Sequence, residues 1–266
     1  MEYIPQALSK VRANRPLVHN ITNLVVMNTT ANALLAIGAS PVMAHAKDEL
    51  EDTLKIASAP VINIGTLDEH WIASMEKAAE IAGKLEKPIV LDPVGAGATR
   101  LRTETALNLL DVGAIKALRG NLSEVAALLG EHGKTRGVDS TAYEKDKAKN
   151  LATAAAKEFN AVVAVTRPVD YVSNGKEIYA IYNGHELLGM VTGTGCMVTA
   201  ITGAFIATEE PLRATVSALA IFGIAAEKAS EETEYSGSFY IKLYDWLYRI
   251  DHNLTKEKAK VERIEP

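Results

Sequence analysis

The chain has 266 residues, of which 48% are hydrophobic and 23% charged, a composition typical of globular proteins. Its 28 basic and 33 acidic residues give a net charge of −5, which argues against general nucleic-acid binding because that function needs a basic face. Cys196 is the only cysteine, the first residues lack the apolar core of a signal peptide, and no apolar run reaches the roughly 20 residues of a membrane span, so we expect a cytoplasmic protein without internal disulfides or a membrane anchor.

The predicted elements alternate between short strands and longer helices. Residues 23–37 have helical periodicity and end at Gly38, a favourable C-cap, and residues 40–44 predict a short strand. Four apolar runs rich in Val and Ile then alternate with four helical segments. The runs cover residues 60–64, 88–91, 115–118 and 161–165, and the helical segments cover residues 68–85, 103–110, 122–129 and 143–159. Continuous apolar runs are typical of strands buried on both faces, so the alternation predicts a parallel sheet between two helical layers.

The pattern changes after the fourth of these runs. Asn174-Gly175 is a strong hairpin signal and predicts two antiparallel strands over residues 170–173 and 176–182. From Cys196 onward the chain is predicted to be helical, over residues 196–208, 212–231 and 238–252, with a charged and solvated tail. No linker or repeat interrupts this order. We therefore expect one α/β domain over residues 1–266 with a mostly parallel central sheet.

The segment Gly193-Thr194-Gly195-Cys196 opens a long helix of small residues. The first N–H groups of a helix have no partner within the helix, and the positive end of the macrodipole lies there, so this turn suits a phosphoryl group in transfer. Cys196 falls in the first turn, where the dipole favours the thiolate. The alternative is a glycine-rich loop with a small buried cysteine that begins a core helix. A nucleophilic pair of Cys196 with His185 is also conceivable, although no third residue suggests itself to orient it.

Three predicted strands end in polar residues. Asp92 follows the strand at 88–91 and precedes a glycine-rich turn, so it suits Mg²⁺ held through water or a substrate phosphate, or else forms an Asp-Pro turn. Arg119 and Glu124 follow the next strand, where the simplest role for Glu124 is the carboxylate of a capping box. Thr166 ends the fourth strand. Because ligands bind at the carboxyl ends of strands in open parallel sheets, these side chains are predicted to face one crevice.

The N-terminal segment contributes further candidates. Asn20, Thr22 and Asn23 precede the first predicted helix, and N-capping alone explains them. Met43 ends the short strand at residues 40–44, where its thioether lines a small apolar pocket or fills the core.

Five blocks of the sequence, in their order and spacing, resemble the hydroxyethylthiazole kinase family. They are VHNITNLVVMNTTANALLAIGASPVMAHA, LDPVGAG, RGNLSEVAAL, VAVTR and GTGCMVTA. The first and last blocks are specific to that family, whereas LDPVGAG and the GNxxE pattern are shared more widely among ribokinase-like kinases. The resemblance implies a three-layer α/β/α sandwich of the ribokinase type without a lid domain. It also implies ATP-dependent phosphorylation of the hydroxyl of 4-methyl-5-(2-hydroxyethyl)thiazole, a salvage step towards thiamine.

The same resemblance implies roles for individual residues. Met43 and Gly193 are expected to contact the thiazole, and Arg119 and Thr166 to contact ATP. Asp92 and Glu124 are expected to organise Mg²⁺ and its waters. The turn from Gly193 through Gly195 to Cys196 becomes the anion hole for the γ-phosphoryl group. The family forms trimers with active sites at subunit interfaces, so Asn23 and Val25 are expected to complete a neighbour's pocket.

One position departs from the wider superfamily, which usually carries Asp in place of Cys196 and uses it as the base on the substrate hydroxyl. The thiazole kinases carry Cys, as this sequence does, and a loose phosphoryl-transfer transition state makes little demand on a base. Three alternatives stay open: a related kinase of hydroxymethylpyrimidine or a sugar, a nucleotide-dependent repair dehydratase on the same fold, and a non-catalytic binding module. Cys196 argues against the dehydratase, and the presence of Asp92, Glu124 and both glycines argues against the binding module.

Overall fold

A computed structural model describes residues 1–112, 115–131 and 141–265. Its strands form one sheet in the order β2-β1-β3-β4-β5-β6-β7-β8-β9. The strands are β1 (Leu17–Ile21), β2 (Ser40–Val42), β3 (Ala59–Asn63), β4 (Ile89–Asp92), β5 (Ile115–Asn121), β6 (Val162–Thr166), β7 (Asp170–Ser173), β8 (Ile178–Ile181) and β9 (Val261–Ile264). Neighbouring strands from β2 to β6 pair in parallel, and β6 to β9 pair antiparallel. The mostly parallel α/β sheet predicted from the sequence is confirmed.

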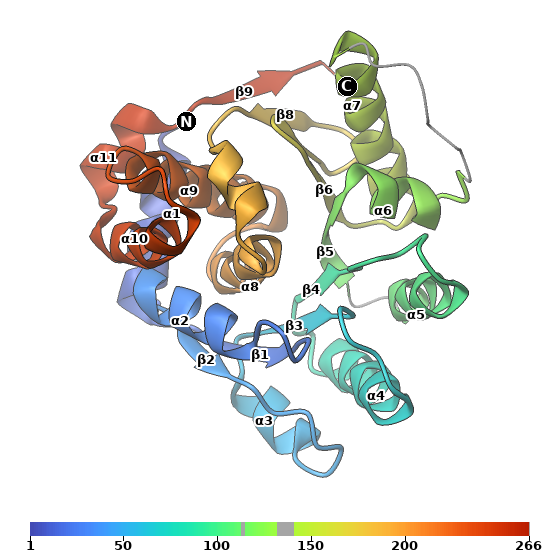
Figure 1. The fold of residues 1–266 in the computed structure, drawn as a ribbon. Coiled ribbons are helices and arrows are strands. Elements are labelled where there is room, and N and C mark those ends of the chain that lie inside the picture. The colour runs from blue at the N-terminus through green and yellow to red at the C-terminus, as the bar shows by residue number, and fades with distance from the viewer. Residues whose placement is uncertain (113–114, 132–140, 266) are drawn as a thin grey trace.

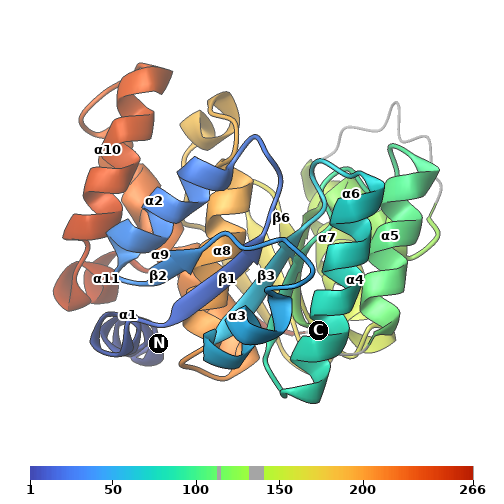
Figure 2. The same cartoon turned by 90° about the horizontal axis from the view of Figure 1, so that it is seen from below.

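Helices cover both faces of the sheet. The helices are α1 (Tyr3–Asn14), α2 (Met27–Ile37), α3 (Leu50–Ile56), α4 (Glu69–Lys84), α5 (Arg100–Asp111), α6 (Leu122–Leu128), α7 (Thr141–Glu158), α8 (Thr194–Ile206), α9 (Pro211–Ser230), α10 (Ser236–Arg249) and α11 (His252–Lys258), with a 3₁₀ helix at Glu186–Met190. Helices α1, α2 and α8–α11 form one layer and α3–α7 the other (Figures 1 and 2). This is the predicted three-layer sandwich. In the described part of the chain every strand belongs to the one sheet, and none forms a lid.

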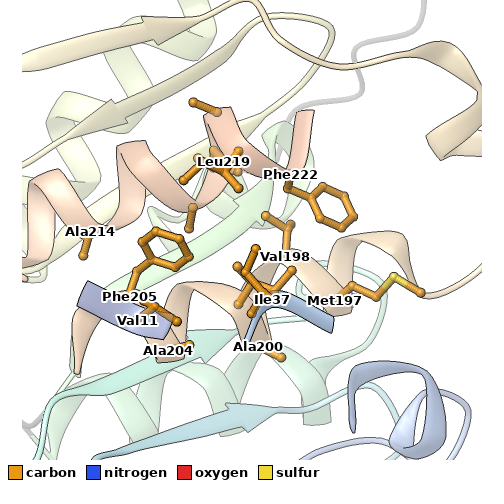
Figure 3. Packing of buried hydrophobic residues seen from close by; sticks show 14 of the residues in the cluster. Val11, Ile37, Met197, Val198, Ala200, Ala204, Phe205, Ala214, Leu219 and Phe222 are labelled. Atoms are coloured by element: carbon orange, nitrogen blue, oxygen red, sulfur yellow. The ribbon is translucent and has the colours of Figure 1, made fainter. Parts of the chain in front are cut away.

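The position of α8 is set by its burial on all sides. Thirteen residues long, this helix is rich in small and apolar side chains, and nearly all of them are buried. Phe205 and Val198 of α8 pack against Leu219 and Phe222 of α9 in the core between the helices and the sheet (Figure 3). A helix that is apolar all round is buried in this way. Because α8 packs between α9 and strands β1, β3 and β4, its N-terminus is fixed at the carboxyl end of these parallel strands.

Several elements differ from the sequence-based prediction. Residues 23–26 are not helical: α2 begins at Met27 after the N-cap Val26, and neither Asn20 nor Asn23 caps it. Asn20 instead lies in the buried strand β1, which the polar residues of LVHNI disguised. The charged C-terminal segment is not only a solvated tail, because β9 extends the sheet beside β8. Helices α1 and α3 were not predicted. No helix among the described residues combines the length and apolar character that crossing a bilayer requires.

Candidate active site

A buried amide joins the two sides of the candidate site. Asn63, the last residue of β3, donates from Nδ2 to Asp92 Oδ2 at 2.9 Å and to Cys196 Sγ at 3.2 Å. Its Oδ1 accepts from Asn23 Nδ2 at 2.8 Å and from the Gly65 N–H at 3.0 Å. Both ends of the amide are thus engaged, which fixes its orientation and leaves Cys196 Sγ as the acceptor of the Asn63 N–H group. Asn23, Asp92 and Cys196, predicted from distant parts of the sequence, are brought together by this one side chain.

Asp92 ends β4 and is almost completely buried, with 1% of its surface exposed. Its Oδ2 also accepts from Thr199 Oγ1 at 2.7 Å, whereas its buried Oδ1 has no hydrogen-bond partner among the residues that the structure describes. Burial raises the pKa of Asp92 to about 6; the Arg119 cation acts in the opposite direction, and the Glu124 carboxylate adds to the rise. A buried carboxylate oxygen without a partner is costly, so Oδ1 is suited to a cation or a cation-bound water.

Cys196 lies in the first turn of α8. Burial raises the pKa of its thiol to about 11, and the nearby Asp92 carboxylate adds to this rise, although the N–H groups of Asn63 and Asn23 oppose it. The Asn23 Nδ2 to Sγ distance is 3.6 Å. The expected stabilisation of a thiolate by the helix dipole is therefore wrong for this site, because lost solvation and the neighbouring anion outweigh it. At neutral pH the residue is a neutral thiol.

The turn before Cys196 is shaped by two glycines. Gly193 is the N-cap of α8 with φ 89°, and a Cβ on it would lie 2.9 Å from Val26 Cγ1. A Cβ on Gly195 would lie 2.7 Å from Arg119 Nη1, so the guanidinium passes directly over the first turn. Arg119 Nη2 donates to Thr166 Oγ1 at 2.8 Å, and its buried Nε has no hydrogen-bond partner in the described part of the chain. A helix N-terminus beside an incompletely bonded guanidinium forms a site for an anion.

A pocket of about 530 Å³ opens from this turn and includes Arg119, Thr166 and Gly195 in its lining. Leu188 and Phe222 contribute apolar wall to the same pocket. This size and mixed lining are typical of small-molecule sites. The pocket has room for a heterocycle with its anionic end at the α8 turn.

Glu124 has the predicted capping role in α6. Its Oε2 accepts the Asn121 N–H at 2.8 Å, while Asn121 Oδ1 accepts the Glu124 N–H at 2.9 Å. Its Oε1 accepts the Gly95 N–H at 2.9 Å and so holds the turn after Asp92. No cluster of three His, Cys, Asp or Glu side chains suited to a metal ion occurs among the side chains that the structure describes, in residues 1–112, 115–131 and 146–265. A metal at this edge therefore needs ligands from substrate and water besides Asp92.

The remaining predicted residues lie at the edge of the site. Met43 follows β2, two strands away from Asn63 in the sheet, and is half-buried. Val25 donates its N–H to Asn23 Oδ1 at 3.1 Å, but its side chain is 63% exposed. His185 lines the large pocket, and its Nδ1 accepts the Leu187 N–H at 3.3 Å. The Cys196 sulfur is bonded by two asparagine amides, so the structure offers no support for a nucleophilic pair with His185.

Sequence reasoning missed three polar residues of this site. Asn63 interrupts the apolar run at residues 60–64 and should have indicated a strand end, as Asp92 did. Thr199 follows Cys196 by three residues, which places both on one face of α8. Asp170, in the pocket lining, begins the hairpin strand β7; burial raises its pKa to about 7, against the opposing effects of the Arg167 N–H and the Arg119 cation. No local pattern distinguishes Asp170 from an ordinary turn residue.

Comparisons with known proteins agree with this geometry. The sequence model of the hydroxyethylthiazole kinase family matches residues 8–253. A hydroxyethylthiazole kinase of Methanococcus vannielii is 65% identical over 265 residues, 100% of both chains. The solved structure of the hydroxyethylthiazole kinase protein of Pyrococcus horikoshii is 61% identical and superposes with a TM-score of 0.94 over 100% of both chains. The pyridoxal kinase of Staphylococcus aureus shares the fold alone, with 18% identity and a TM-score of 0.62 over 94% of this chain and 99% of its own. The chain belongs to the hydroxyethylthiazole kinase family.

Proposed function

We propose that this site transfers the γ-phosphoryl group of ATP to the hydroxyl of 4-methyl-5-(2-hydroxyethyl)thiazole, a step in thiamine salvage. The observation that carries the proposal is the N-terminus of α8, where Gly195 lies under the Arg119 guanidinium and Cys196 lies against the Asn63 amide. The anion site thus lies between the pocket of about 530 Å³ and the hydrogen-bonded cluster of Asn23, Asn63 and Asp92. This is the arrangement that a kinase needs, because the phosphoryl group moves between donor and acceptor along one line. Residues 1–266 would act as one kinase domain.

ATP is the larger ligand and fits the pocket of about 530 Å³. Its phosphates would approach the α8 turn, where Arg119 and the first N–H groups of the helix neutralise their charge. Thr166, which accepts from Arg119 at 2.8 Å, holds the guanidinium in place beside the phosphates. Leu188 and Phe222 would contact the base.

Mg²⁺ is the cofactor that the donor chemistry requires, and Asp92 fits it through the unpartnered Oδ1. When bound, the ion screens the charge of the phosphates and orients them for transfer. Both oxygens of Glu124 already accept backbone N–H groups, so Glu124 would reach the ion through water while it holds the turn at Gly95. Chelation is expected to abolish turnover, and added Mg²⁺ to restore it.

The acceptor would lie on the other side of the turn, with Asn23, Val25, Met43 and Gly193 around the thiazole. The exposed side chains of Leu24 and Val25, at 66% and 63%, support a homotrimer in which this segment completes a neighbour's pocket. Exposed apolar side chains next to a ligand site are typical of an interface. Light scattering of the purified protein tests the trimer. Because ATP is the donor and Cys196 works as a free thiol, we place the protein in the cytoplasm.

The decisive experiment measures ADP release with Mg-ATP and the thiazole, with hydroxymethylpyrimidine, and with no acceptor. We expect release that depends on the thiazole. Turnover with the pyrimidine alone would keep the fold and the anion site but refute the assignment of the acceptor. Calorimetric binding of the thiazole without any turnover would refute the kinase and favour a binding module.

A further inference from the structure

Arg102, on α5, reaches out of its helix to two loops at the edge of the sheet. Its Nη1 donates to Val94 O at 2.7 Å and to Ile64 O at 3.3 Å, and its Nη2 donates to Gly65 O at 2.8 Å. All three acceptors are backbone carbonyl groups. Within the described residues no carboxylate forms an ion pair with this guanidinium. The hydrogen bonds of this side chain therefore stabilise the backbone of the two loops.

The two loops that Arg102 joins carry the residues at the centre of the site. Ile64 and Gly65 directly follow Asn63, and the Gly65 N–H donates to Asn63 Oδ1 at 3.0 Å. Val94 follows Asp92 by two residues. Between the loops the Ile64 N–H donates to the Asp92 carbonyl at 3.2 Å, which is the last backbone link between them. Beyond that hydrogen bond the two loops no longer pair through their backbones. The Arg102 guanidinium then holds them together in place of the hydrogen bonds of the sheet.

The next residue of α5 strengthens the same attachment. Thr103 Oγ1 accepts the Gly97 N–H at 2.8 Å, so the turn after Asp92 is bonded to the first helical turn of α5 at two points. The two Nη groups of the planar guanidinium, whose donors point in fixed directions, serve three carbonyls on two loops at once. A lysine at this position offers a compact ammonium that cannot reproduce the fork.

We propose that Arg102 is a positioning residue for phosphoryl transfer: it fixes the loops that carry Asn63 and Asp92, and through them the spacing of Asp92 from Cys196. The inference rests on the proposed function. Arg102 acts through these residues, because its hydrogen bonds go to backbone and not towards the pocket. Met43 belongs to another loop, whereas Asn23 donates to Asn63 Oδ1 at 2.8 Å and so contacts one of the two loops. Of the expected acceptor contacts, those of Met43 and Gly193 should therefore be independent of Arg102.

The test compares Arg102→Gln with the matched control Arg100→Gln in the thiazole-dependent ADP assay. Arg100 is exposed on the same helix and, among the described residues, pairs only with Glu104 at 3.4 Å, so its loss should leave kcat at the wild-type value. For Arg102→Gln we expect kcat to fall roughly 10- to 100-fold, because small misplacements of catalytic groups have effects of this size. The KM for the thiazole should stay within about threefold, since uniform binding of the acceptor is unchanged. Added guanidinium ion should restore part of kcat in Arg102→Gln and none in the control.

Arg102→Lys keeps the positive charge and most of the aliphatic side chain. It therefore tests the positioning role if Arg102→Gln fails to fold. We expect its kcat to be lowered roughly tenfold, because it loses the fork. A wild-type kcat in folded Arg102→Lys would overturn the inference, as would a loss of activity in Arg102→Gln that matches its loss of folded protein. If wild-type protein itself shows no thiazole-dependent turnover, the proposed function fails instead, and the two failures are thus distinguished.

Discussion

Replacing Cys196 by Ala tests whether the thiol takes the proton from the acceptor hydroxyl. The pKa of the thiol is raised to about 11, four units above pH 7, so only about one molecule in 10⁴ carries the thiolate there. Forming the base at pH 7 would cost about 5 kcal/mol before any chemistry begins. General base catalysis is typically worth 10²- to 10⁴-fold. Because the thiol starts protonated, we expect Cys196→Ala to lose less than about 100-fold in kcat.

The pH dependence separates the two roles more sharply than one rate does. If the thiolate were the base, kcat of the wild type would rise about tenfold per pH unit towards 11, and Cys196→Ala would lose that rise. We expect kcat to be flat between about pH 7 and 9 in both proteins. Cys196→Asp should keep kcat within about tenfold of wild type, since the amides of Asn63 and Asn23 that reach Sγ can donate to a carboxylate.

The assay is thiazole-dependent ADP release across this pH range, with the fraction of folded protein measured by circular dichroism. Thr202→Ala is the matched control, because Thr202 lies on the same helix and its hydroxyl donates to the Val198 carbonyl at 2.8 Å, away from the candidate site. A loss beyond about 100-fold in folded Cys196→Ala would refute the reasoning, because it is of the size that general base catalysis supplies, as would a rise of wild-type kcat with pH that the variant lacks.

Three further predictions follow from the same geometry. Since burial raises the pKa of Asp92 to about 6, kcat/KM of the wild type should fall as pH drops below about 6 and the carboxylate is protonated, and the pH–rate profile checks this. Gly195→Ala would bring a Cβ within 2.7 Å of Arg119 Nη1, so we expect KM for ATP to rise roughly tenfold, against an unchanged value for exposed Gly237→Ala, in nucleotide titrations. The pKa of Asp170 is raised to about 7, so the folded state binds this proton more tightly than the unfolded state and loses stability as pH rises from about 4 to 7. Asp170→Asn should therefore raise the melting temperature by a few degrees at pH 8 and leave it nearly unchanged at pH 4, as scanning calorimetry can show.

The sequence predicted the fold well where the hydrophobic pattern was continuous. The buried parallel strands β3 to β6 read as apolar runs, and Asn174-Gly175 indicated the hairpin. Strand β1 was not predicted because two of its buried residues, His19 and Asn20, are polar. A sequence that contains such residues resembles that of a loop. Strand β9 escaped because its half-exposed, charged sequence VERI is stabilised by pairing with β8 and not by its own pattern. Both failures are tertiary effects that no local pattern carries.

The sequence predicted which polar residues lie at the ends of strands in the site, but not which residues they contact. Asp92, Arg119 and Thr166 were placed at the carboxyl edge from sequence alone, and the Arg119–Thr166 hydrogen bond brings two of them together. The ionisation of Cys196 was predicted in the wrong direction because a helix N-terminus is a local signal, whereas burial and the Asp92 carboxylate are not visible in the chain order. Asn63 could have been recognised as a strand end, but its three contacts with distant residues, Asn23, Asp92 and Cys196, are not visible in the chain order either.

A neutral thiol suits this site because negative charge is already concentrated there. Asp92 and Glu124 carry two carboxylates at one edge of the sheet, and the phosphates of ATP would add more. The cationic groups that offset them are Arg119 and the positive end of α8. A thiolate at Cys196 would lie beside the Asp92 carboxylate, which raises the free energy needed to form it. A neutral thiol that accepts two amide N–H groups keeps its own proton available, so the acceptor hydroxyl can be held without an additional anion. Since the loose transition state places little charge on the attacking oxygen, catalysis at this site depends more on position and charge balance than on a strong base.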